Sequence, residues 1–392
     1  MQGGDVRFEF ATANRVLFGS GTLKEVPAAA AAFGRRVLAV IESPERSAHL
    51  FELLQQAGLK VTPYCIQGEP SIASVLEGVR IARSLQPDLV IGMGGGSALD
   101  NAKAVAVLAT NPGEILDYLE VIGRGQILSQ PPLACLAIPT TAGTGAEVTR
   151  NAVIFSPEHQ LKISLRSPFL LPRLAIIDPQ LTFSMPPELT ASTGMDALTQ
   201  LIEPFVSNAS NPLTDAVCRE GIKRASRSLH LAYQRPGLSE AREDMAIASL
   251  FGGMALANAR LGAVHGFAGV IGGAYSAPHG AICARLLPII MAANIHALRA
   301  RAESSPYLDR FSEIAQLVTG NPLAAPEDGA EWVKGLIGSL NIPPLSDYGL
   351  NPGSFPALIE QAQKSSSMKG NPIGLNEAEL GLILEEATHP LA

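Results

Sequence analysis

The sequence predicts an α/β N-terminal domain with a doubly wound, Rossmann-like parallel sheet, followed by an all-α C-terminal domain. In the first half of the chain, short β-branched runs alternate with helical patterns, which is typical of βαβ units. From residue 186 onward helical periodicity dominates, and no further segment has the pattern of a strand. A length of 392 residues suits two domains. We expect them to cover residues 1–183 and 184–392, with the ligand site between them.

The parallel strands are expected at 36–41, 60–65, 89–93, 133–138 and 174–177. Amphipathic helices are expected between the early strands, at 48–57, 72–84 and 98–110. The helices of the second domain are expected at 191–206, 212–233, 239–261, 280–298, 307–318, 330–340 and 355–365. Two uncharged runs, 125–146 and 261–284, are long enough to span a membrane. Because they carry prolines and clustered glycines, we interpret both as buried segments that line a site.

Composition excludes several classes of protein. Hydrophobic residues make up 47% and charged residues 17% of the chain, which indicates large cores and not a disordered protein. The net charge of -7 argues against nucleic-acid or anionic-membrane partners. The first ten residues lack the apolar run of a signal peptide, and the four cysteines are far apart. We therefore expect a cytoplasmic protein with reduced core or surface thiols.

A glycine loop follows the strand expected at 89–93. Its residues are Gly94, Gly95, Gly96 and Ser97, and a helix begins directly after them. Such a loop lets the backbone approach a pyrophosphate, and the helix adds the positive end of its dipole. The Rossmann fingerprint itself is absent, because Ser97 replaces its third glycine.

Side chains around this loop have their own expected roles. Ser97 and Asp100 have the spacing of a capping box for the helix, with Lys103 placed to pair with Asp100. Glu42 ends an earlier strand. A carboxylate there can accept hydrogen bonds from the ribose hydroxyls of NAD and repel the 2′-phosphate of NADP.

A threonine-rich loop follows the strand expected at 133–138. It carries Thr140, Thr141 and Thr144 among small residues, so its hydroxyls and amides are able to wrap a ribose or a phosphate. The alternative is an ordinary polar connection.

Metal-binding residue types occur in the helical half. Asp196 and Gln200 are four residues apart on one expected helix, and His265 and His279 lie in the uncharged run downstream. A carboxylate and two imidazoles suit a divalent ion such as Fe²⁺ or Zn²⁺. Gln200 is able to add an amide oxygen, which is a weaker ligand. The alternative is that the histidines are hydrogen-bonded core residues.

Together these segments resemble the iron-containing (group III) alcohol dehydrogenase family over nearly the whole chain. The resemblance is carried by Gly94–Ser97 with Asp100 and Lys103, by Pro139–Thr149, by Gly194–Leu198, and by the His265 and His279 motifs. It implies that Gly94–Ser97 hold the pyrophosphate and that Thr140, Thr141 and Thr144 lie along the nicotinamide half. It also implies that Lys162 lies near the ribose, that Glu42 favours NAD, and that Asp196, His265 and His279 are catalytic metal ligands.

Two positions depart from the family pattern. The family has a histidine metal ligand where this chain has Gln200, and often a second histidine where it has Gly269. The resemblance therefore implies a divalent metal site that is weak or empty. The related maleylacetate reductases also vary at the metal site.

The expected function is that of an NAD(H)-dependent oxidoreductase. It would interconvert a small alcohol and its aldehyde or ketone by hydride transfer, assisted by metal. The alternatives are a maleylacetate reductase-like oxo-acid reductase, a dehydroquinate synthase-like lyase, and a catalytically silent nucleotide-binding homologue. Beyond the small-molecule substrate, we expect a homodimer and neither nucleic-acid nor membrane partners.

Overall fold

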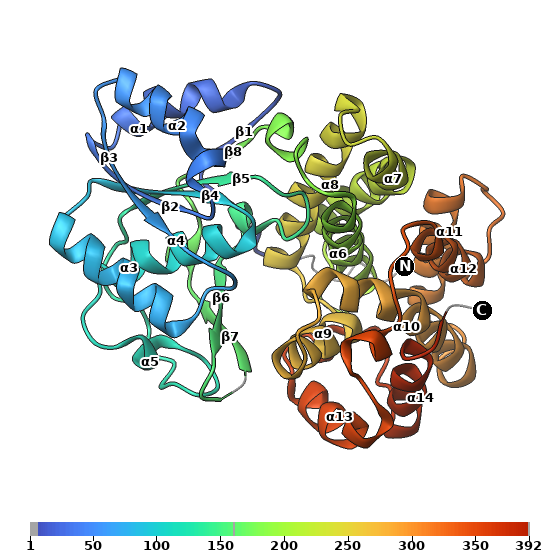
Figure 1. Ribbon diagram of the computed structural model, residues 1–392. Helices are drawn as coiled ribbons and strands as arrows, with labels where there is room; N and C mark the ends of the chain where they lie inside the picture. The colour runs from blue at the N-terminus through green and yellow to red at the C-terminus, as the bar shows by residue number, and fades with distance from the viewer. Residues whose placement is uncertain (1–6, 160, 391–392) are drawn as a thin grey trace.

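A six-stranded parallel sheet forms the first half of the protein. The computed structural model describes residues 7–159 and 161–390. The strands are β1 (Val16–Phe18), β2 (Arg36–Ile41), β3 (Lys60–Cys65), β4 (Leu89–Gly94), β5 (Ala134–Pro139) and β8 (Leu174–Ile177). Their order in the sheet is β1-β8-β5-β4-β2-β3, and every pair is parallel (Figure 1). The predicted doubly wound α/β class is confirmed.

Helices cover both faces of this sheet because its strands are apolar on both sides. In β2, Val37, Ala39 and Ile41 face one core with α1 (Val26–Ala31) and α2 (Pro44–Gln56). The alternate residues Leu38 and Val40 belong to cores on the other face, beneath α3 (Ile72–Leu85) and α4 (Gly96–Leu108). This period of two is that of a strand buried on both faces.

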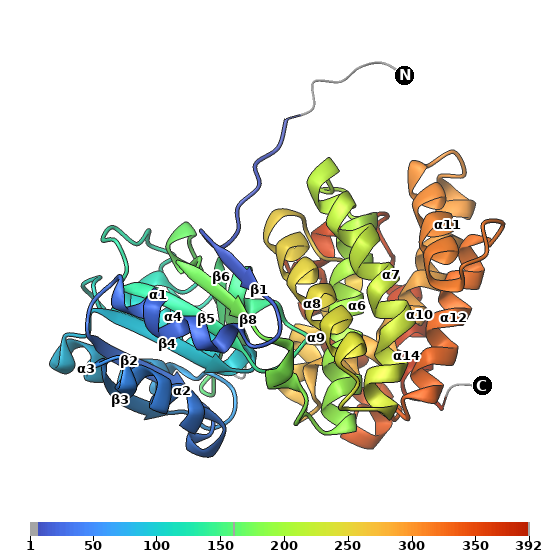
Figure 2. The same ribbon diagram turned by 90° about the horizontal axis from the view of Figure 1, so that it is seen from above.

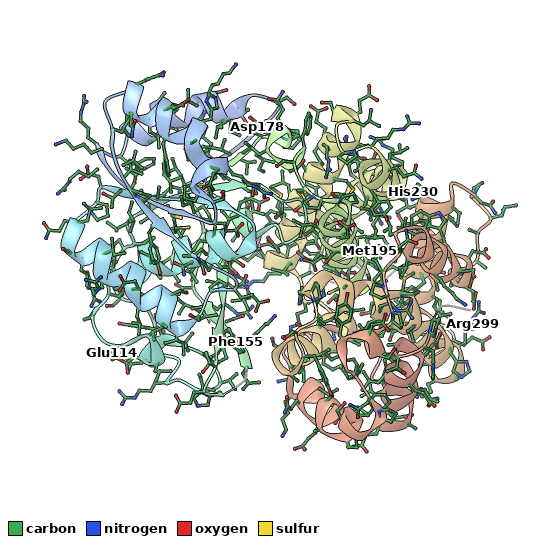
Figure 3. The ribbon with its side chains drawn as sticks, in the orientation of Figure 1. Glu114, Phe155, Asp178, Met195, His230 and Arg299 are labelled. Atoms are coloured by element: carbon green, nitrogen blue, oxygen red, sulfur yellow. The ribbon has the colours of Figure 1, made fainter. Side chains whose placement is uncertain are left out.

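Some elements of this half were not predicted. β1 has only three residues, too few for a periodic signal. β6 (Asn151–Ser156) and β7 (Leu161–Arg166) form an antiparallel hairpin outside the main sheet, with Phe155 on its first strand (Figure 3). A short helix, α5 (Ile115–Tyr118), was also missed. The predicted strands are confirmed to within one residue at each end.

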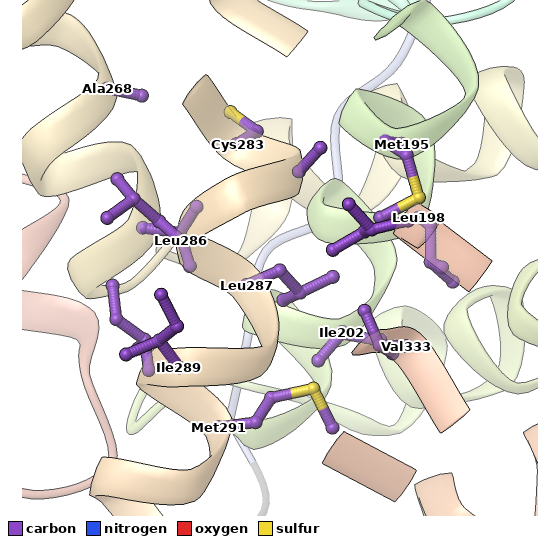
Figure 4. Close-up of a cluster of buried hydrophobic side chains, with 14 of the residues drawn as sticks. Met195, Leu198, Ile202, Ala268, Cys283, Leu286, Leu287, Ile289, Met291 and Val333 are labelled. Atoms are coloured by element: carbon purple, nitrogen blue, oxygen red, sulfur yellow. The ribbon is translucent and has the colours of Figure 1, made fainter. Parts of the chain in front are cut away.

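The second half is helical. Its helices are α6 (Pro187–Val206), α7 (Pro212–Gln234), α8 (Ser239–Asn258), α9 (Ala263–Ala274), α10 (His279–Arg301), α11 (Pro306–Thr319), α12 (Pro326–Ser339), α13 (Phe355–Lys364) and α14 (Glu377–Ala387). Among the described residues no strand follows Ile177, as predicted. α9 and α14 were not predicted as helices. One large apolar core joins α6 and α10 through residues such as Leu198 and Leu287 (Figure 4).

The sheet half and the helical half touch through α8 (Figure 2). Leu250 of α8 shares a core with Ala175 and Ile177 of β8. A Cβ atom at Gly253 would lie 2.4 Å from the Gly145 carbonyl oxygen, so the two backbones meet without side chains between them. The Asn258 side chain also exchanges two hydrogen bonds with the Ala11 backbone.

The two uncharged runs differ in burial. Residues 261–284 form α9 and the start of α10 and are largely buried, as predicted. The prediction was wrong for the first part of 125–146, where Ile127 is 90% exposed, although β5 itself is buried. In the described part of the chain α10 has the length and apolarity of a membrane span, and 83% of that window is buried. α8 and α9 meet the same criterion only as a pair bent by 97°.

Candidate active site

The glycine loop and Glu42 lie at one edge of the sheet. β2, β4 and β5 are neighbours, so their carboxyl ends meet there, the usual ligand edge of a doubly wound sheet. The exposed Glu42 follows β2, and its Oε1 accepts a hydrogen bond from the Gly95 amide at 3.1 Å. The Glu42 carboxylate therefore reaches the loop expected to hold a pyrophosphate.

The threonine loop packs directly on the glycine loop. The Thr140 amide donates to the Gly94 carbonyl at 2.8 Å. A Cβ atom at Gly96 would lie 2.9 Å from Thr144 Cγ2, whereas one at Gly95 would lie 3.5 Å from Thr141 Cγ2, an ordinary contact. Of these two glycines, only Gly95 has room beside it for a further small group, because the space next to Gly96 is already filled by Thr144.

The predicted capping box at Ser97 and Asp100 is wrong. α4 begins two residues earlier than expected, at Gly96, because Gly95 takes the extended conformation of an N-cap. Ser97 therefore lies inside the first turn. Asp100 Oδ2 accepts from the Val153 amide at 2.9 Å, and Oδ1 lies 2.9 Å from Lys103 Nζ, the predicted ion pair. Asp100 thus joins α4 to the hairpin.

Lys162 lies where the hairpin meets the helical half. It is on β7, and its Nζ forms an ion pair with Glu69 at 2.7 Å. A Cβ atom at Gly272 of α9 would lie 3.2 Å from the same nitrogen. β7 and α9 are side by side in Figure 1.

Three predicted metal-site residues come together from three helices. Asp196 of α6 places Oδ1 3.4 Å from Nε2 of His265 on α9 and 3.8 Å from Nε2 of His279 at the start of α10. The side chain of Asp196 is 4% exposed and that of His279 is 36% exposed, so the cluster opens on the His279 side. Asp196 Oδ1 is buried and has no hydrogen-bond partner among the described residues.

Close backbone packing brings these helices together. A Cβ atom at Gly280 would lie 2.0 Å from the Ser192 carbonyl oxygen. Because glycine leaves this space free, the start of α10 can approach α6 and bring His279 to Asp196. The threonine loop touches the same helix, since a Cβ atom at Gly143 would lie 2.7 Å from Thr193 Cβ.

Glu203 orients His265, a role the sequence analysis missed. Its Oε2 lies 2.6 Å from His265 Nδ1, and its Oε1 accepts from the Val264 amide at 2.7 Å. A carboxylate on Nδ1 leaves Nε2 directed at Asp196 and raises the basicity of the imidazole. Glu203 lies seven residues after Asp196 on the same helix, a spacing that offers a weak sequence signal.

Cys283 also belongs to this cluster, although the sequence analysis treated it as an ordinary thiol. Its Sγ lies 3.7 Å from His279 Nε2 and 3.9 Å from His265 Nε2. One donor atom from each of Asp196, His265, His279 and Cys283 lies within 4.8 Å of every other. The four-residue spacing from His279 on one helix is a weak sequence signal that could have indicated it.

The groups of the cluster shift one another's pKa values. Burial acts to raise the pKa of Cys283, but the two imidazoles lower it below its ordinary value. Burial acts to lower the pKa of His265, but Cys283 and Glu203 hold it well above its ordinary value. The pKa of Asp196 is lowered against the effect of burial by His265 and His279. Such mutually shifted groups are typical of functional sites.

The two positions that depart from the family pattern lie beside the cluster. Gln200 is buried one turn after Asp196 on α6, and its Oε1 has no hydrogen-bond partner among the described residues. Gly269 lies one turn after His265 on α9, and a Cβ atom there would meet nothing within 4 Å.

Comparison with known proteins covers both halves of the chain. The family model "Iron-containing alcohol dehydrogenase" matches residues 13–179, and "Fe-containing alcohol dehydrogenase family, C-terminal" matches residues 190–388. Alcohol dehydrogenase 4 of Saccharomyces cerevisiae (strain YJM789) is 38% identical over 343 residues, 87% of either chain. The 1,3-propanediol dehydrogenase of Klebsiella pneumoniae is 36% identical over 341 residues, 85% of either chain.

A solved structure agrees over almost the full length. A 1,3-propanediol oxidoreductase superposes with a TM-score of 0.89 and 33% identity, covering 97% of this chain and 100% of that one. These matches favour an alcohol-dehydrogenase-like oxidoreductase over a lyase or a silent nucleotide-binding protein. The chain belongs to the iron-containing alcohol dehydrogenase family, as its sequence motifs indicate.

Proposed function

We propose that this protein interconverts a small alcohol and its aldehyde or ketone, with NAD(H) bound at the sheet edge and a divalent ion at the helical cluster. The observation that carries the proposal is the convergence of Asp196, His265 and His279 from three helices. The threonine loop links the two ligand sites, because it touches the glycine loop at Gly96 and α6 at Thr193.

The nucleotide site consists of the two loops and their neighbours. Gly94–Ser97 and the start of α4 would hold the pyrophosphate, and Thr140, Thr141 and Thr144 would follow the nicotinamide half. Glu42 would accept from the adenosine ribose, and Lys162 would lie near the other ribose. Asp100 acts indirectly, by fixing α4 against the hairpin.

The donor set fits a divalent ion. Asp196 Oδ1 is a buried carboxylate oxygen without a hydrogen-bond partner among the described residues, which is costly unless a cation or a donor completes it. Asp196, His265 and His279 would hold the ion, and Gln200 is the neutral fourth donor that the sequence predicts. When bound, the ion polarises the substrate oxygen as a Lewis acid and lowers the pKa of an alcohol.

The chain's own residues prepare this site in three ways. Glu203 fixes the ring of His265, so a ligand atom is already oriented before substrate enters. The 36% exposure of His279 gives the substrate oxygen access from one side, while Asp196 and Cys283 close the other. The space beside Gly269 leaves room for the substrate carbon chain.

We also propose the larger organisation that the sequence predicts. The chain would divide into residues 1–183 and 184–392 and act as a cytoplasmic homodimer. All four cysteines are free thiols, which suits a reducing compartment. Light scattering of the purified chain measures the number of subunits.

The test combines a substrate panel with a variant of the glycine loop. We expect the purified protein to oxidise NADH with one or more small aldehydes, ketones or oxo acids. Gly95→Val should abolish NADH binding and turnover while leaving the circular dichroism spectrum unchanged. A Cβ atom there makes only ordinary contacts with Glu42 and Thr141, and the rest of the Val side chain would occupy the place expected for the pyrophosphate. Normal NADH binding by the variant would exclude this loop as the pyrophosphate site.

A further inference from the structure

We propose that the Cys283 thiolate, and not the Gln200 amide, is the fourth protein ligand of the metal ion. The resulting set of Asp196, His265, His279 and Cys283 would favour Zn²⁺ over Fe²⁺. The inference rests on the proposed function, since it completes the same metal site.

The geometry matches a tetrahedral ion. Metal–ligand distances of about 2.0–2.3 Å require donor atoms about 3.3–3.8 Å apart along the edges of a tetrahedron. Asp196 Oδ1 lies 3.4 Å from His265 Nε2 and 3.8 Å from His279 Nε2, and Cys283 Sγ lies 3.9 Å and 3.7 Å from the same two nitrogens. The two remaining edges of the tetrahedron are no longer than 4.8 Å, so the four donor atoms surround a space that suits one ion.

Helix α10 fixes two of the donors at once. His279 and Cys283 are four residues apart and so project from the same face. The Cys283 side chain is fully buried, and the next turn of α10 anchors it through Leu286 and Leu287 in the core (Figure 4). The sulfur therefore lies near the imidazoles without the rotamer freedom of a surface thiol.

Charge favours the thiolate over the amide. With Asp196 as the one anionic ligand and Gln200 as the fourth donor, a buried divalent ion would keep one uncompensated positive charge. A Cys283 thiolate brings the ligand set to two negative charges and balances the ion, which lowers the cost of burying it. Glu203 does not take this place, because both of its oxygens already bind His265 and the Val264 amide.

The chemical type of the donor then sets the metal preference. A thiolate is a soft ligand that Zn²⁺ accepts well, whereas carboxylate and amide oxygens are hard ligands. Loss of the usual histidine at position 200 would therefore shift the metal preference towards Zn²⁺ instead of emptying the site.

The experiment uses the full chain stripped of metal and reloaded with Co²⁺ or Zn²⁺. Cys283→Ser, Gln200→Ala and His265→Ala are compared with Cys218→Ala, which removes another fully buried thiol on α7. We expect the wild type to show a thiolate-to-cobalt charge-transfer absorption that Cys283→Ser loses and that Gln200→Ala and Cys218→Ala keep. Competition should show a Zn²⁺ affinity at least tenfold lower in Cys283→Ser, and a smaller preference for Zn²⁺ over Fe²⁺.

One measurement needs no variant, in case Cys283→Ser fails to fold. X-ray absorption of the zinc-loaded wild type should contain a sulfur neighbour at about 2.3 Å. Metal bound without sulfur, or a charge-transfer band that survives in Cys283→Ser, would overturn the Cys283 assignment and leave the proposed function intact. If neither the wild type nor Cys218→Ala binds metal, the metal-assisted function fails as well.

Discussion

Glu42 is the residue on which we expect the choice of nicotinamide nucleotide to depend. Its carboxylate lies within hydrogen-bond distance of the Gly95 amide, so a 2′-phosphate near that position would meet a negative charge. We predict that NADH binds more tightly than NADPH, and that Glu42→Gln narrows the ratio of the two affinities about tenfold, which corresponds to about 1.4 kcal/mol. Fluorescence titration with each nucleotide, in the wild type and in Glu42→Gln, measures the two affinities and their ratio. Equal affinities in the wild type would contradict the role given to Glu42.

Glu147 is a buried carboxyl group whose protonation affects stability. Burial raises its pKa to about 7, from an ordinary value of 4.5. The folded state therefore favours the neutral acid, and stability is lost as pH rises from about 4.5 through 7. We predict that Glu147→Gln raises the free energy of unfolding by roughly 1–3 kcal/mol at pH 8, with most of the gain gone at pH 5.

Denaturant titration at pH 8 and pH 5 measures the free energy of unfolding of Glu147→Gln and of the wild type. Glu158→Gln is the control, because Glu158 is exposed. A gain of equal size at both pH values would mean that side-chain packing, and not ionisation, causes the effect.

Some residues of the candidate site could be predicted from the sequence, and others could not. Asp196, His265 and His279 were recognisable because their types and motifs carry the metal chemistry. Cys283 was not, because a thiol next to apolar residues has the same sequence signature whether it packs or binds metal. The capping-box prediction was wrong because Gly95, which is closer to the strand, is the N-cap, and glycine is only slightly less favourable than serine at that position.

At the scale of elements, Lys103 holds α4, the threonine loop and the hairpin together. It is 1% exposed, and its Nζ donates to the Ala146 and Asn151 carbonyls and to Thr149 Oγ1. We predict that Lys103→Met lowers the free energy of unfolding by about 3–5 kcal/mol, because it leaves Asp100 without its buried cation. Chemical denaturation measures the loss.

Lys60→Met is the matched control, since Lys60 is exposed on β3. It should change stability by no more than about 0.5 kcal/mol. A loss of similar size in both variants would mean that the buried contacts of Lys103 contribute little.

Elements with a strong local signal were predictable, and those that depend on distant contacts were not. The central strands carry continuous apolar runs because both faces are buried. The hairpin of β6 and β7 alternates buried and exposed residues only partly, and it is fixed by remote groups such as Asp100 and Lys103. Helix α9 was interpreted as part of an uncharged run, because its several glycines are poor helix formers and it carries no Asp, Glu, Lys or Arg.

At the scale of the whole molecule, the contact between α8 and the sheet half makes the two proposed ligand sites parts of one structure. Leu250 packs against β8, and the Gly145–Gly253 contact joins the threonine loop to α8. Substitution of either glycine would push these elements apart, so the arrangement of the two sites depends on this interface. We therefore expect both halves to unfold in a single transition.

Two ligands that bind different halves then test this coupling. A ligand that binds only the folded state at one hundred times its Kd stabilises it by about 2.7 kcal/mol. We predict that NADH and Zn²⁺ each raise the one melting temperature by a few degrees. Gly95→Val should lose the NADH effect and keep the Zn²⁺ effect, and Asp196→Asn should do the reverse. Calorimetry that resolves two transitions, one moved only by NADH and the other only by Zn²⁺, would show that the two halves unfold independently, against the tight packing of α8 on the sheet.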